Sequence, residues 1–407
     1  MHRLRLVGIG PGTREYVLPK AVEAMEKSDI IIAAKRIIPM LEEILTEEKN
    51  ILPMKGIQAT VDLIEECLQK EDVALIVSGD PLMYSLLRTL KNDEKGSKIP
   101  MEVVPGIGSL QMLGAKCGIS MEEAKIISVH GRTHKRGSIA MAVSEHSDCF
   151  FLCSKEQGPA WLSEIMLEYH LENVTVYAGS ELSYAEEEIS VGSPKQMSKK
   201  EFPSLCVALI HNDTPRAIGR VGLLQDTDFV RGKTPMTKEE VRAIIIQKMR
   251  LHPDSIVWDV GAGTGSVTIE SARFCPFGEV YAIERSKAAI ELIEKNKEKF
   301  NVPHVKIFAG TAREEIKKLP CPDIVFIGGS GGDLELIVEY LASFKKAIKV
   351  VVSAVTVETL AQACHCLGEY DKDYEMTQIS IGKSRKLGSY HIMDNNNPVT
   401  LLEAVIG

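Results

Sequence analysis

The segment Trp258–Ser266 constrains the fold of this chain more than any other. Its sequence, Trp-Asp-Val-Gly-Ala-Gly-Thr-Gly-Ser, carries a hydrophobic strand into three alternating glycines and then into a helix. Glycines let the backbone approach a ligand closely, and the start of a helix offers unpaired N–H donors. The spacing is GxGxG, whereas the dinucleotide fingerprint is GxGxxG, so a pyrophosphate is not the expected ligand. The segment predicts an α/β domain that binds a ligand at a strand end.

Glu284 adds to this pattern. It ends the next predicted strand, about 20 residues after the first glycine, where a carboxylate accepts hydrogen bonds from ribose hydroxyls. The alternative is a tight strand-to-helix turn beside a surface glutamate. The glycines and the acid together favour a ligand that carries a ribose.

Short apolar runs alternate with amphipathic stretches on both sides of a turn-rich segment, which predicts two α/β domains. We expect domains at 1–212 and 231–407, joined by a linker at 213–230. A capping box of Thr237 and Glu240 should start a helix over 237–250. Further helices are expected at 18–27, 60–70, 159–170, 266–274 and 288–300. Strands are expected at 4–9, 29–34, 73–77, 101–104, 126–129, 149–153, 174–177, 205–210, 255–260, 279–283, 305–309, 323–327, 349–353, 378–381, 390–393 and 399–405.

Composition narrows the function. The 407 residues are 44% hydrophobic and 26% charged, a globular balance, and the net charge of −8 disfavours nucleic acid as a partner. Nine cysteines form no pair of CxxC motifs, and Cys364-His365-Cys366 lacks zinc-site spacing, so we expect reduced thiols and no metal. No apolar run approaches the length of a membrane span. These features predict a cytoplasmic protein with no membrane or nucleic-acid partner.

Three glycine-bearing loops follow predicted strands in the amino-terminal half. They are Val7–Gly12, Ser78–Pro81 and Val104–Ser109. None is a P-loop, because no Gly-Lys-Ser/Thr follows. Each alone could be an ordinary turn, but loops at neighbouring strand ends can line one cleft.

Two kinds of segment could bind carboxylates. His130–Arg136 and Lys383–Lys386 are basic patches on an acidic chain, and the fork of an arginine suits a carboxylate; the alternative is a solvated loop. Gly328–Gly332 exposes backbone N–H groups after another strand, so we expect a substrate carboxylate there, with a flexible loop as the alternative.

The carboxyl-terminal half resembles the S-adenosylmethionine-dependent methyltransferases, and more closely the C15-methylating, decarboxylating enzymes of corrin biosynthesis. The resemblance lies in residues 237–242, 258–270, 281–284, 310–314 and 326–333. It implies a Rossmann-like fold whose cofactor-binding residues are Thr237, Gly261, Ala262, Gly263, Thr264, Gly265, Glu284 and Ala312. We add Gly329, Ser330 and Gly331 as substrate-binding candidates, with Ser330 and Asp333 as positioning residues.

The amino-terminal half resembles the tetrapyrrole methylases, which bind S-adenosylmethionine through loops unlike those of the Rossmann group. Ser128–Arg132 and Glu181–Ile189 look like the C5-methylating member of the corrin pathway. The resemblance implies two α/β subdomains and a cofactor held by Gly10, Pro11, Gly79, Asp80 and Ser109. Gly108 departs from the serine that many members carry. His130, Arg132 and Arg385 are the basic substrate-binding candidates.

Together the two resemblances imply a fused C5,15-methyltransferase that also decarboxylates, with one S-adenosylmethionine per domain and a precorrin or cobalt-precorrin as substrate. We expect a homo-oligomer, and we find no motif for a general acid or base. Two alternatives stay open: a methyltransferase fusion that acts on another substrate, and a non-catalytic protein that binds a corrin or the cofactor.

Overall fold

The computed structural model describes residues 2–131, 134–216 and 222–407. They divide into two compact units. Unit 1 takes in the chain up to 133 together with 147–167 and 172–213. Unit 2 takes in 134–146, 168–171 and the chain from 214 onward.

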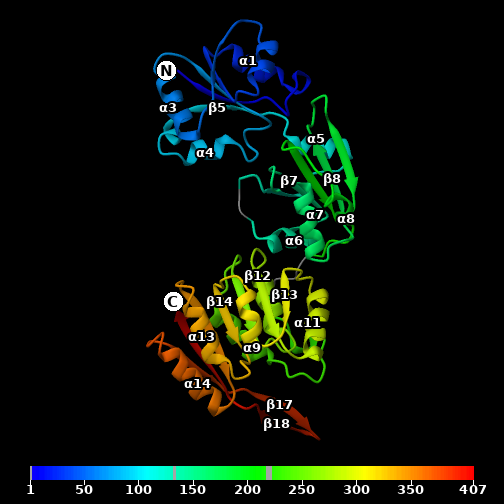
Figure 1. The fold of residues 1–407 in the computed structure, drawn as a ribbon, viewed down its shortest axis with the longest axis vertical. Helices are drawn as coiled ribbons and strands as arrows, with labels where there is room; N and C mark the ends of the chain where they lie inside the picture. Colours follow the sequence, from blue (N-terminus) through cyan, green and yellow to red (C-terminus); the bar gives the residue numbers. More distant parts are fainter. Residues whose placement is uncertain (1, 132–133, 217–221) are drawn as a thin grey trace. The chain divides into compact units, whose positions relative to one another are not determined.

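Unit 1 begins with a fully parallel sheet in the order β3-β2-β4-β1-β5. This part of the chain is coloured blue to cyan in Figure 1, where β5 is labelled beside α1, α3 and α4. Apolar side chains fill both faces, because each buried strand alternates between them. One core contains helices α1 (Pro19–Glu26) and α2 (Ile38–Ile44), and the other contains α3 (Ile57–Cys67) and α4 (Leu86–Asn92). The strands are β1 (Leu4–Gly8), β2 (Ile30–Ala33), β3 (Asn50–Pro53), β4 (Val73–Val77) and β5 (Met101–Val104).

The second sheet of unit 1 is mixed, with the order β6-β7-β10-β8-β9. Only β6 and β7 pair in parallel. Leu113 of α5 (Ser109–Cys117) packs with Phe150 of the sheet in one core. The remaining elements are β6 (Lys125–Ser128), β7 (Asp148–Leu152), β8 (Thr175–Ser180), β9 (Glu188–Gly192), β10 (Cys206–His211), α7 (Pro159–Glu168) and α8 (Pro194–Met197).

Unit 2 is built on one larger sheet in the order β13-β12-β11-β14-β15-β19-β16. Its first five strands are parallel, and β19 is antiparallel to both neighbours. The direction of winding reverses between β11 and β14, and open α/β sheets bind ligands at such a point. The strands are β11 (Ile256–Val260), β12 (Glu279–Glu284), β13 (Val305–Ala309), β14 (Ile324–Ile327), β15 (Ile348–Ala354), β16 (Glu375–Ile379) and β19 (Val399–Ile406).

Helices cover both faces of this sheet. Val257 faces the core formed with α9 (Glu239–Met249) and α10 (Ser266–Phe274), to which Met141 of α6 (Arg136–Glu145) also belongs. Its neighbour Trp258 faces the opposite core, which contains α13 (Leu334–Ala342) and α14 (Val357–Gly368). The other helices are α11 (Lys287–Lys299), α12 (Ala312–Glu315) and the short 3-10 helices η1 (Arg14–Tyr16), η2 (Gly96–Lys98), η3 (Asp226–Asp228) and η4 (Ile316–Lys318).

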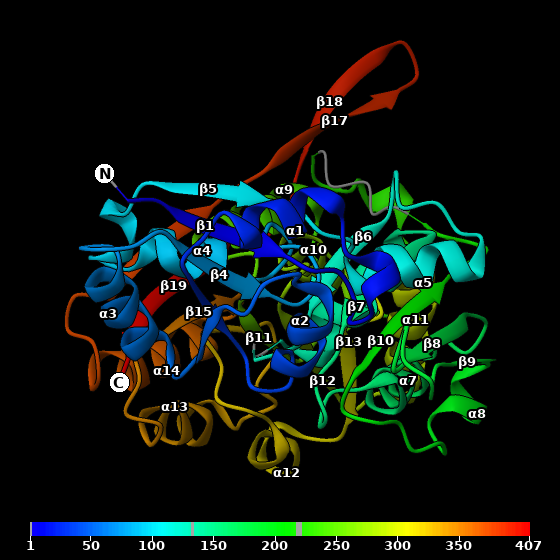
Figure 2. The same cartoon turned by 90° about the horizontal axis from the view of Figure 1, so that it is seen from above.

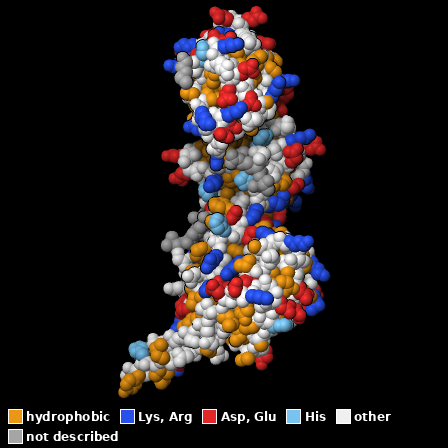
Figure 3. Space-filling view, turned by 90° about the vertical axis from the view of Figure 1, so that its left-hand side faces the viewer, with side chains coloured by type: hydrophobic (Ala, Val, Ile, Leu, Met, Phe, Trp, Pro, Cys, Tyr) orange, Lys and Arg blue, Asp and Glu red, His pale blue; other side chains and the backbone are white. Residues whose placement is uncertain are grey.

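A two-stranded hairpin, β17 (Gly382–Leu387) and β18 (Tyr390–Asn395), projects from unit 2 (Figures 2 and 3). Leu387, Tyr390 and Met393 are exposed on it. An isolated hairpin with apolar side chains in water is marginal at best, because it buries little surface.

The α/β fold class is confirmed, but several details differ from expectation. The capping box of Thr237 and Glu240 is wrong: α9 begins at Glu239 after the N-cap Lys238, with no side-chain cap. Strands β3, β9 and β17 were not expected. Helix α6 was not expected either, since the basic cluster before it was interpreted as a loop.

A buried arginine fixes the segment that leads into α9. Arg242 is fully buried, and its guanidinium donates to the carbonyls of Leu224 at 2.6 Å and Thr237 at 2.8 Å. It also pairs with Asp226 at 3.1 Å and lies over the ring of Phe229. An unpaired buried charge costs several kcal/mol, so this segment belongs structurally to unit 2.

The position of the domain boundary stays a prediction, and the contacts of Arg242 allow two fragments with different starting points to be compared. A fragment of residues 231–407 lacks Leu224 and Asp226, so we expect it to lose about 3 kcal/mol of stability relative to a fragment of 222–407. Thermal unfolding followed by circular dichroism would measure the difference. Arg242→Met in both fragments should shrink it, and equal melting of the unmodified fragments would contradict the role given to Arg242.

Candidate cofactor and substrate sites

The loops after β11 and β14 are locked together by backbone contact. A Cβ added at Gly261 would lie 2.3 Å from the carbonyl oxygen of Gly329, and Gly261 has a φ of +73°. The N–H of Gly328 donates to Val260 at 3.0 Å. Only glycine fits at position 261, and the two predicted loops therefore meet at the reversal point of the sheet.

Gly263 differs from Gly261 because no atom lies closer than ordinary contact distance to a Cβ placed there. Its φ is +57°, but a Cβ there would have Pro235 oxygen as its nearest neighbour, at 3.5 Å. This glycine is not required by packing. The space above it suits a ligand that lies against the backbone.

Glu284 holds the Gly263 loop through hydrogen bonds to the backbone. Its Oε2 accepts from the N–H of Gly263 at 2.8 Å. Its Oε1 accepts from Arg285 at 2.9 Å and Ser286 at 2.8 Å. The carboxylate is thus fixed at the end of β12, beside the predicted cofactor loop.

Two buried polar atoms beneath this loop have no hydrogen-bond partner among the described residues: Asp259 Oδ1 and Thr264 Oγ1. Burial raises the pKa of Asp259 to about 7. The hydrogen bond that Thr268 donates at 2.5 Å lowers this pKa, but its effect is smaller than that of burial. Buried polar atoms are nearly always paired, so these two fit a polar ligand that completes them. The residues present therefore suit S-adenosylmethionine, which carries an ammonium, a carboxylate and a ribose.

The glycine loop 328–332 also carries the predicted substrate residues. Asp333 pairs with Arg313 at 2.9 Å, and Ser330 Oγ accepts from the N–H of Gly332 at 3.4 Å. A Cβ at Gly331 would lie 3.6 Å from an Arg285 nitrogen, so a cation stands beside the loop. Sequence analysis missed Arg285, although its place directly after Glu284 could have indicated it.

The other carboxyl-terminal candidates are more scattered. Thr237 uses its carbonyl for Arg242, and Ala312 is the buried first residue of α12. Arg385 lies on β17 of the hairpin and pairs with Asp394 at 2.6 Å.

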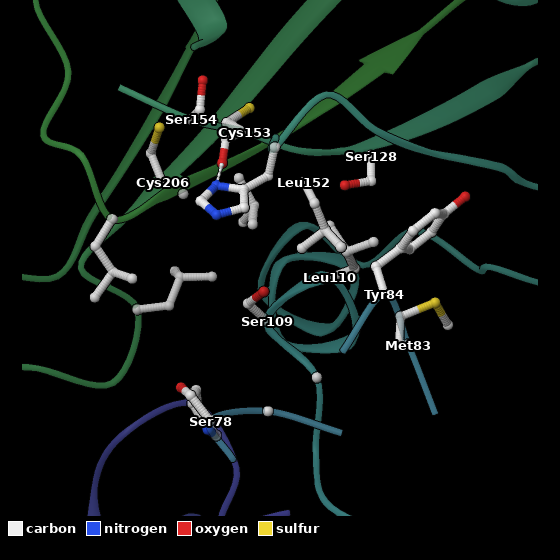
Figure 4. A pocket seen from close by; sticks show the side chains of 18 of the residues that line it. Ser78, Met83, Tyr84, Ser109, Leu110, Ser128, Leu152, Cys153, Ser154 and Cys206 are labelled. Atoms are coloured by element: carbon white, nitrogen blue, oxygen red, sulfur yellow. Dashed lines mark hydrogen bonds between the residues drawn. The ribbon is translucent and has the colours of Figure 1, made fainter. Parts of the chain in front are cut away.

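The three amino-terminal loops line one pocket of about 590 Å³ in unit 1 (Figure 4). Pro11, Gly79, Asp80, Ser109 and His130 are among the residues that form its wall. Figure 4 shows Ser78 and Ser109 on the loops, with Cys153 and Cys206 across the cavity. The clustering expected from the sequence is therefore present.

Close contacts between the backbones of glycines hold these loops together. Gly10 and Gly79 exchange backbone hydrogen bonds of 2.6 and 3.3 Å. A Cβ at Gly106 would lie 2.3 Å from the Gly79 oxygen, and one at Gly8 would lie 2.6 Å from it. By contrast, the nearest atom to a Cβ at Gly79 is 3.9 Å away, so Gly79 borders open space.

Several side chains of this pocket already have partners. Asp80 accepts from the N–H of Leu82 at 2.9 Å, and His130 Nδ1 lies 3.2 Å from the Cys153 oxygen. The hydrogen bond that the Cys153 thiol donates to Cys206, together with burial, raises the pKa of Cys153, while the same bond lowers the pKa of Cys206. Arg132, the remaining basic candidate, lies outside the described residues.

In the part of the chain that the structure describes, no helix has the length and apolar character needed to cross a membrane. The same residues contain no group of three or more metal-ligating side chains.

Two family models match consecutive parts of the chain. Residues 3–197 match the tetrapyrrole (corrin/porphyrin) methylases, and residues 228–405 match the precorrin methyltransferase domain. A probable cobalt-precorrin-6B C(15)-methyltransferase (decarboxylating) from Pyrobaculum calidifontis is 38% identical, over 44% of this chain and 94% of that protein. The protein of the same name from Sulfolobus acidocaldarius is 35% identical, over 45% and 97%.

Two solved structures are similar to about half of the chain each. A precorrin-6y C5,15-methyltransferase structure from Geobacter metallireducens is 35% identical and covers 45% of this chain and 96% of its own, with a TM-score of 0.42. A precorrin-6Y methylase from Archaeoglobus fulgidus is 18% identical and covers 52% and 98%, with a TM-score of 0.41.

Glu284→Gln tests the carboxylate at the end of β12. The amide keeps the shape but loses one acceptor and the charge, so we expect S-adenosylmethionine to bind unit 2 more weakly by about 1–3 kcal/mol. Calorimetric titration of the full chain would measure this. Glu291→Gln, an exposed change on α11, is the matched control. An unchanged affinity in Glu284→Gln would remove this residue from the site.

Asp259 predicts a pH dependence of stability. Its pKa of about 7 exceeds the ordinary 3.8, so between these values the folded protein holds a proton that the unfolded chain has released. The free energy of unfolding therefore falls as the pH rises from about 4 to about 7. We expect Asp259→Asn, which cannot ionise, to lose less thermal stability than wild type between about pH 4 and about pH 7.

The exposed Asp373→Asn is the control for this measurement, because it changes the same side chain outside the core. Equal pH profiles for wild type and Asp259→Asn would show that Asp259 ionises normally.

Proposed function

The chain belongs to the precorrin methyltransferases, and from that membership we propose that it methylates a precorrin or cobalt-precorrin at C5 in unit 1 and at C15 in unit 2. Unit 2 also releases the acetate carboxyl at C12. The proposal rests above all on two separate glycine-lined sites, one in each unit, each with a glycine of positive φ that packing does not require.

Bound S-adenosylmethionine supplies a methyl group that its sulfonium makes electrophilic. In unit 2, Glu284 would hold the ribose, and the backbone of Ala262, Gly263 and Gly265 would lie along the cofactor. The unpaired oxygens of Asp259 and Thr264 would form hydrogen bonds with the polar end of the cofactor. Thr237 and Ala312 would border it.

In unit 1, Pro11, Gly79, Asp80 and Ser109 would hold the cofactor in the 590 Å³ pocket, with Gly10 supporting Gly79. One cofactor in each unit is part of the proposal. His130 would meet the substrate at the same pocket, together with Arg132.

The reaction depends more on aligning the acceptor carbon with the methyl group than on acid or base catalysis. The reduced tetrapyrrole carbons are enamine-like nucleophiles, so the protein mainly orients the carbon toward the methyl group and excludes water. In unit 2, Gly329 and Gly331 would hold a substrate carboxylate beside Arg285, while Ser330 and Asp333 position the loop. When carbon dioxide leaves, the electron pair of the broken carbon–carbon bond passes into the protonated macrocycle.

Two further expectations stay predictions: that the chain forms a homo-oligomer and that it acts in the cytoplasm. The exposed apolar side chains of the hairpin β17–β18 support the first. The negative net charge supports a small-molecule substrate over nucleic acid.

Valine at Gly263 and at Gly79 should separate the two methylations. Each glycine has a positive φ and borders open space, so a branched side chain would fill the cofactor position. We expect Gly263→Val to lose C15 methylation and decarboxylation together, and Gly79→Val to lose C5 methylation alone. Mass spectrometry of the products would measure both.

Gly388→Val and Gly118→Val are the matched controls, since both positions have a positive φ and no atom near a Cβ. They should keep both methylations despite the backbone strain. Decarboxylation that persisted in Gly263→Val would show that the two steps do not share this site.

A further inference from the structure

Two cysteines lie side by side in the wall of the unit 1 pocket. Cys153 directly follows β7, Cys206 is the first residue of β10, and both line the cavity (Figure 4). All nine cysteines of the chain lie in the described ranges, and none of them is in a disulfide. The proposed methylation chemistry gives this pair no role.

The strand register places the two residues opposite each other. Strands β7 and β10 are antiparallel, and their ladder ends with Leu152 opposite Val207. The next position in this register sets Cys153 opposite Cys206. Directly opposed residues of an antiparallel pair have Cα atoms about 4.5–5.5 Å apart, and a disulfide spans about 4.4–6.8 Å between Cα atoms. A bond between the two sulfurs therefore fits this backbone.

The two thiols already contact each other. The Cys153 thiol donates a hydrogen bond to the sulfur of Cys206. This contact agrees with the register, since side chains at opposed positions lie on the same face of a sheet. A disulfide then requires only that the sulfurs approach to about 2 Å, which the two side chains can do without a shift of either strand.

The pair is chemically asymmetric. The hydrogen bond from Cys153 lowers the pKa of Cys206, although burial opposes this effect. The thiolate is the form that attacks an oxidant, so Cys206 is the nucleophile of the pair. In Cys149 and Cys275, by contrast, burial raises the pKa to about 12, so these thiols react slowly.

The pocket gives a small oxidant a path to these sulfurs. Cys153 is 6% exposed and Cys206 is 8% exposed, so neither thiol stands on the outer surface. The cavity of about 590 Å³ that they line nevertheless admits a molecule as small as hydrogen peroxide. The pair is therefore open to small oxidants and shielded from large ones.

We propose that Cys153 and Cys206 form a redox-active pair, which hydrogen peroxide oxidises to a reversible disulfide in the wall of the unit 1 pocket. The disulfide would join two segments of that wall, 153–156 and 204–207, by a covalent bond. The inference goes beyond the proposed function and does not depend on it, because neither cofactor nor substrate takes part.

The reaction has two steps. The Cys206 thiolate attacks one oxygen of the peroxide, the O–O bond breaks, and hydroxide leaves, so that Cys206 becomes a sulfenic acid. The Cys153 sulfur then attacks the Cys206 sulfur, and the S–O bond breaks to release water. Hydroxide takes up the proton that the Cys206 thiol had released. The two thiols thus lose two electrons and two protons, and the peroxide becomes two molecules of water.

Peptide mapping of the full chain tests the proposal. The reduced protein would be treated with dilute hydrogen peroxide, alkylated, digested and analysed by mass spectrometry. We expect a linked pair of peptides that carry Cys153 and Cys206, lighter by two hydrogen atoms than the two peptides together. Dithiothreitol should restore both thiols, because a disulfide is reversible and a sulfinic acid is not.

Half-buried cysteines of unit 1 provide the internal comparison. Burial raises the pKa of Cys67 and of Cys117. The disulfide should therefore form at least about tenfold faster than either of these thiols is oxidised. Cys67→Ser/Cys117→Ser is the matched control, since both positions lie outside the pocket, and it should form the disulfide at the wild-type rate.

Single variants separate the two roles within the pair. In Cys153→Ser, Cys206 should stop at the sulfenic acid, which dimedone traps as a stable adduct. In Cys206→Ser, Cys153 should be oxidised at least about tenfold more slowly than in wild type, because the nucleophile is gone. Equal melting temperatures of the variants and wild type would show that folding is intact.

The outcomes separate this inference from the proposed function. Cys153 and Cys206 that are alkylated equally with and without peroxide would overturn the inference, and so would oxidation no faster than that of Cys67 and Cys117. S-adenosylmethionine should slow the oxidation, because the proposed function places it in the same pocket. Undiminished disulfide formation at high S-adenosylmethionine concentration would support the thiol pair and contradict only that placement of the cofactor.

Discussion

Backbone contact between glycines at neighbouring strand ends organises both units. In unit 1 the Gly79 oxygen approaches Gly8 and Gly106 so closely that no side chain fits, and in unit 2 Gly329 does the same to Gly261. These contacts pull the loops of adjacent strands into one surface. Each surface retains one glycine, Gly79 or Gly263, where the nearest backbone atom is far enough away to leave room for a Cβ. The two folds thus build ligand-facing main chain by the same physical means.

The basic side chains fall into two groups, those paired with acids inside the fold and those that face no acid, and the sequence does not distinguish the two. Arg242 is fully buried, and its carboxylate and carbonyl partners make it a structural anchor. Arg5 similarly pairs with Asp72 at 3.0 Å and Ser28 at 3.0 Å. Arg88 and Lys91 differ in what surrounds them, since they line a pocket of unit 1 that has no acid among its described lining residues. The environment of each cation, more than its identity, decides whether it anchors the fold.

Prediction from the sequence succeeded where one local pattern decides the structure. Strands β4 and β5, strand β13 and helix α10 have the bounds expected, because a glycine lies within two residues of one end of each. The edge strand β9 and the hairpin strand β17 were missed, since exposed strands lack a continuous apolar run. The predicted capping box is wrong because α9 begins one residue later than the Thr-x-x-Glu pattern indicates.

The candidate sites show the same division. The glycine loops and Glu284 could be found because their residue types and spacing carry the geometry. The pairing of Cys153 with Cys206 could not, because only the register of the sheet shows that these two residues lie opposite each other.

The position of β19 has a consequence for how the protein is made. Residues 399–406 come last among the strands, yet they lie between β15 and β16 and pair with both. A ribosome-bound chain that has not released them holds β15 with one unpaired edge, and an open edge invites pairing with other chains. The sheet of unit 2 therefore closes only after synthesis of its final strand, while all strands of unit 1 have by then long been available for pairing.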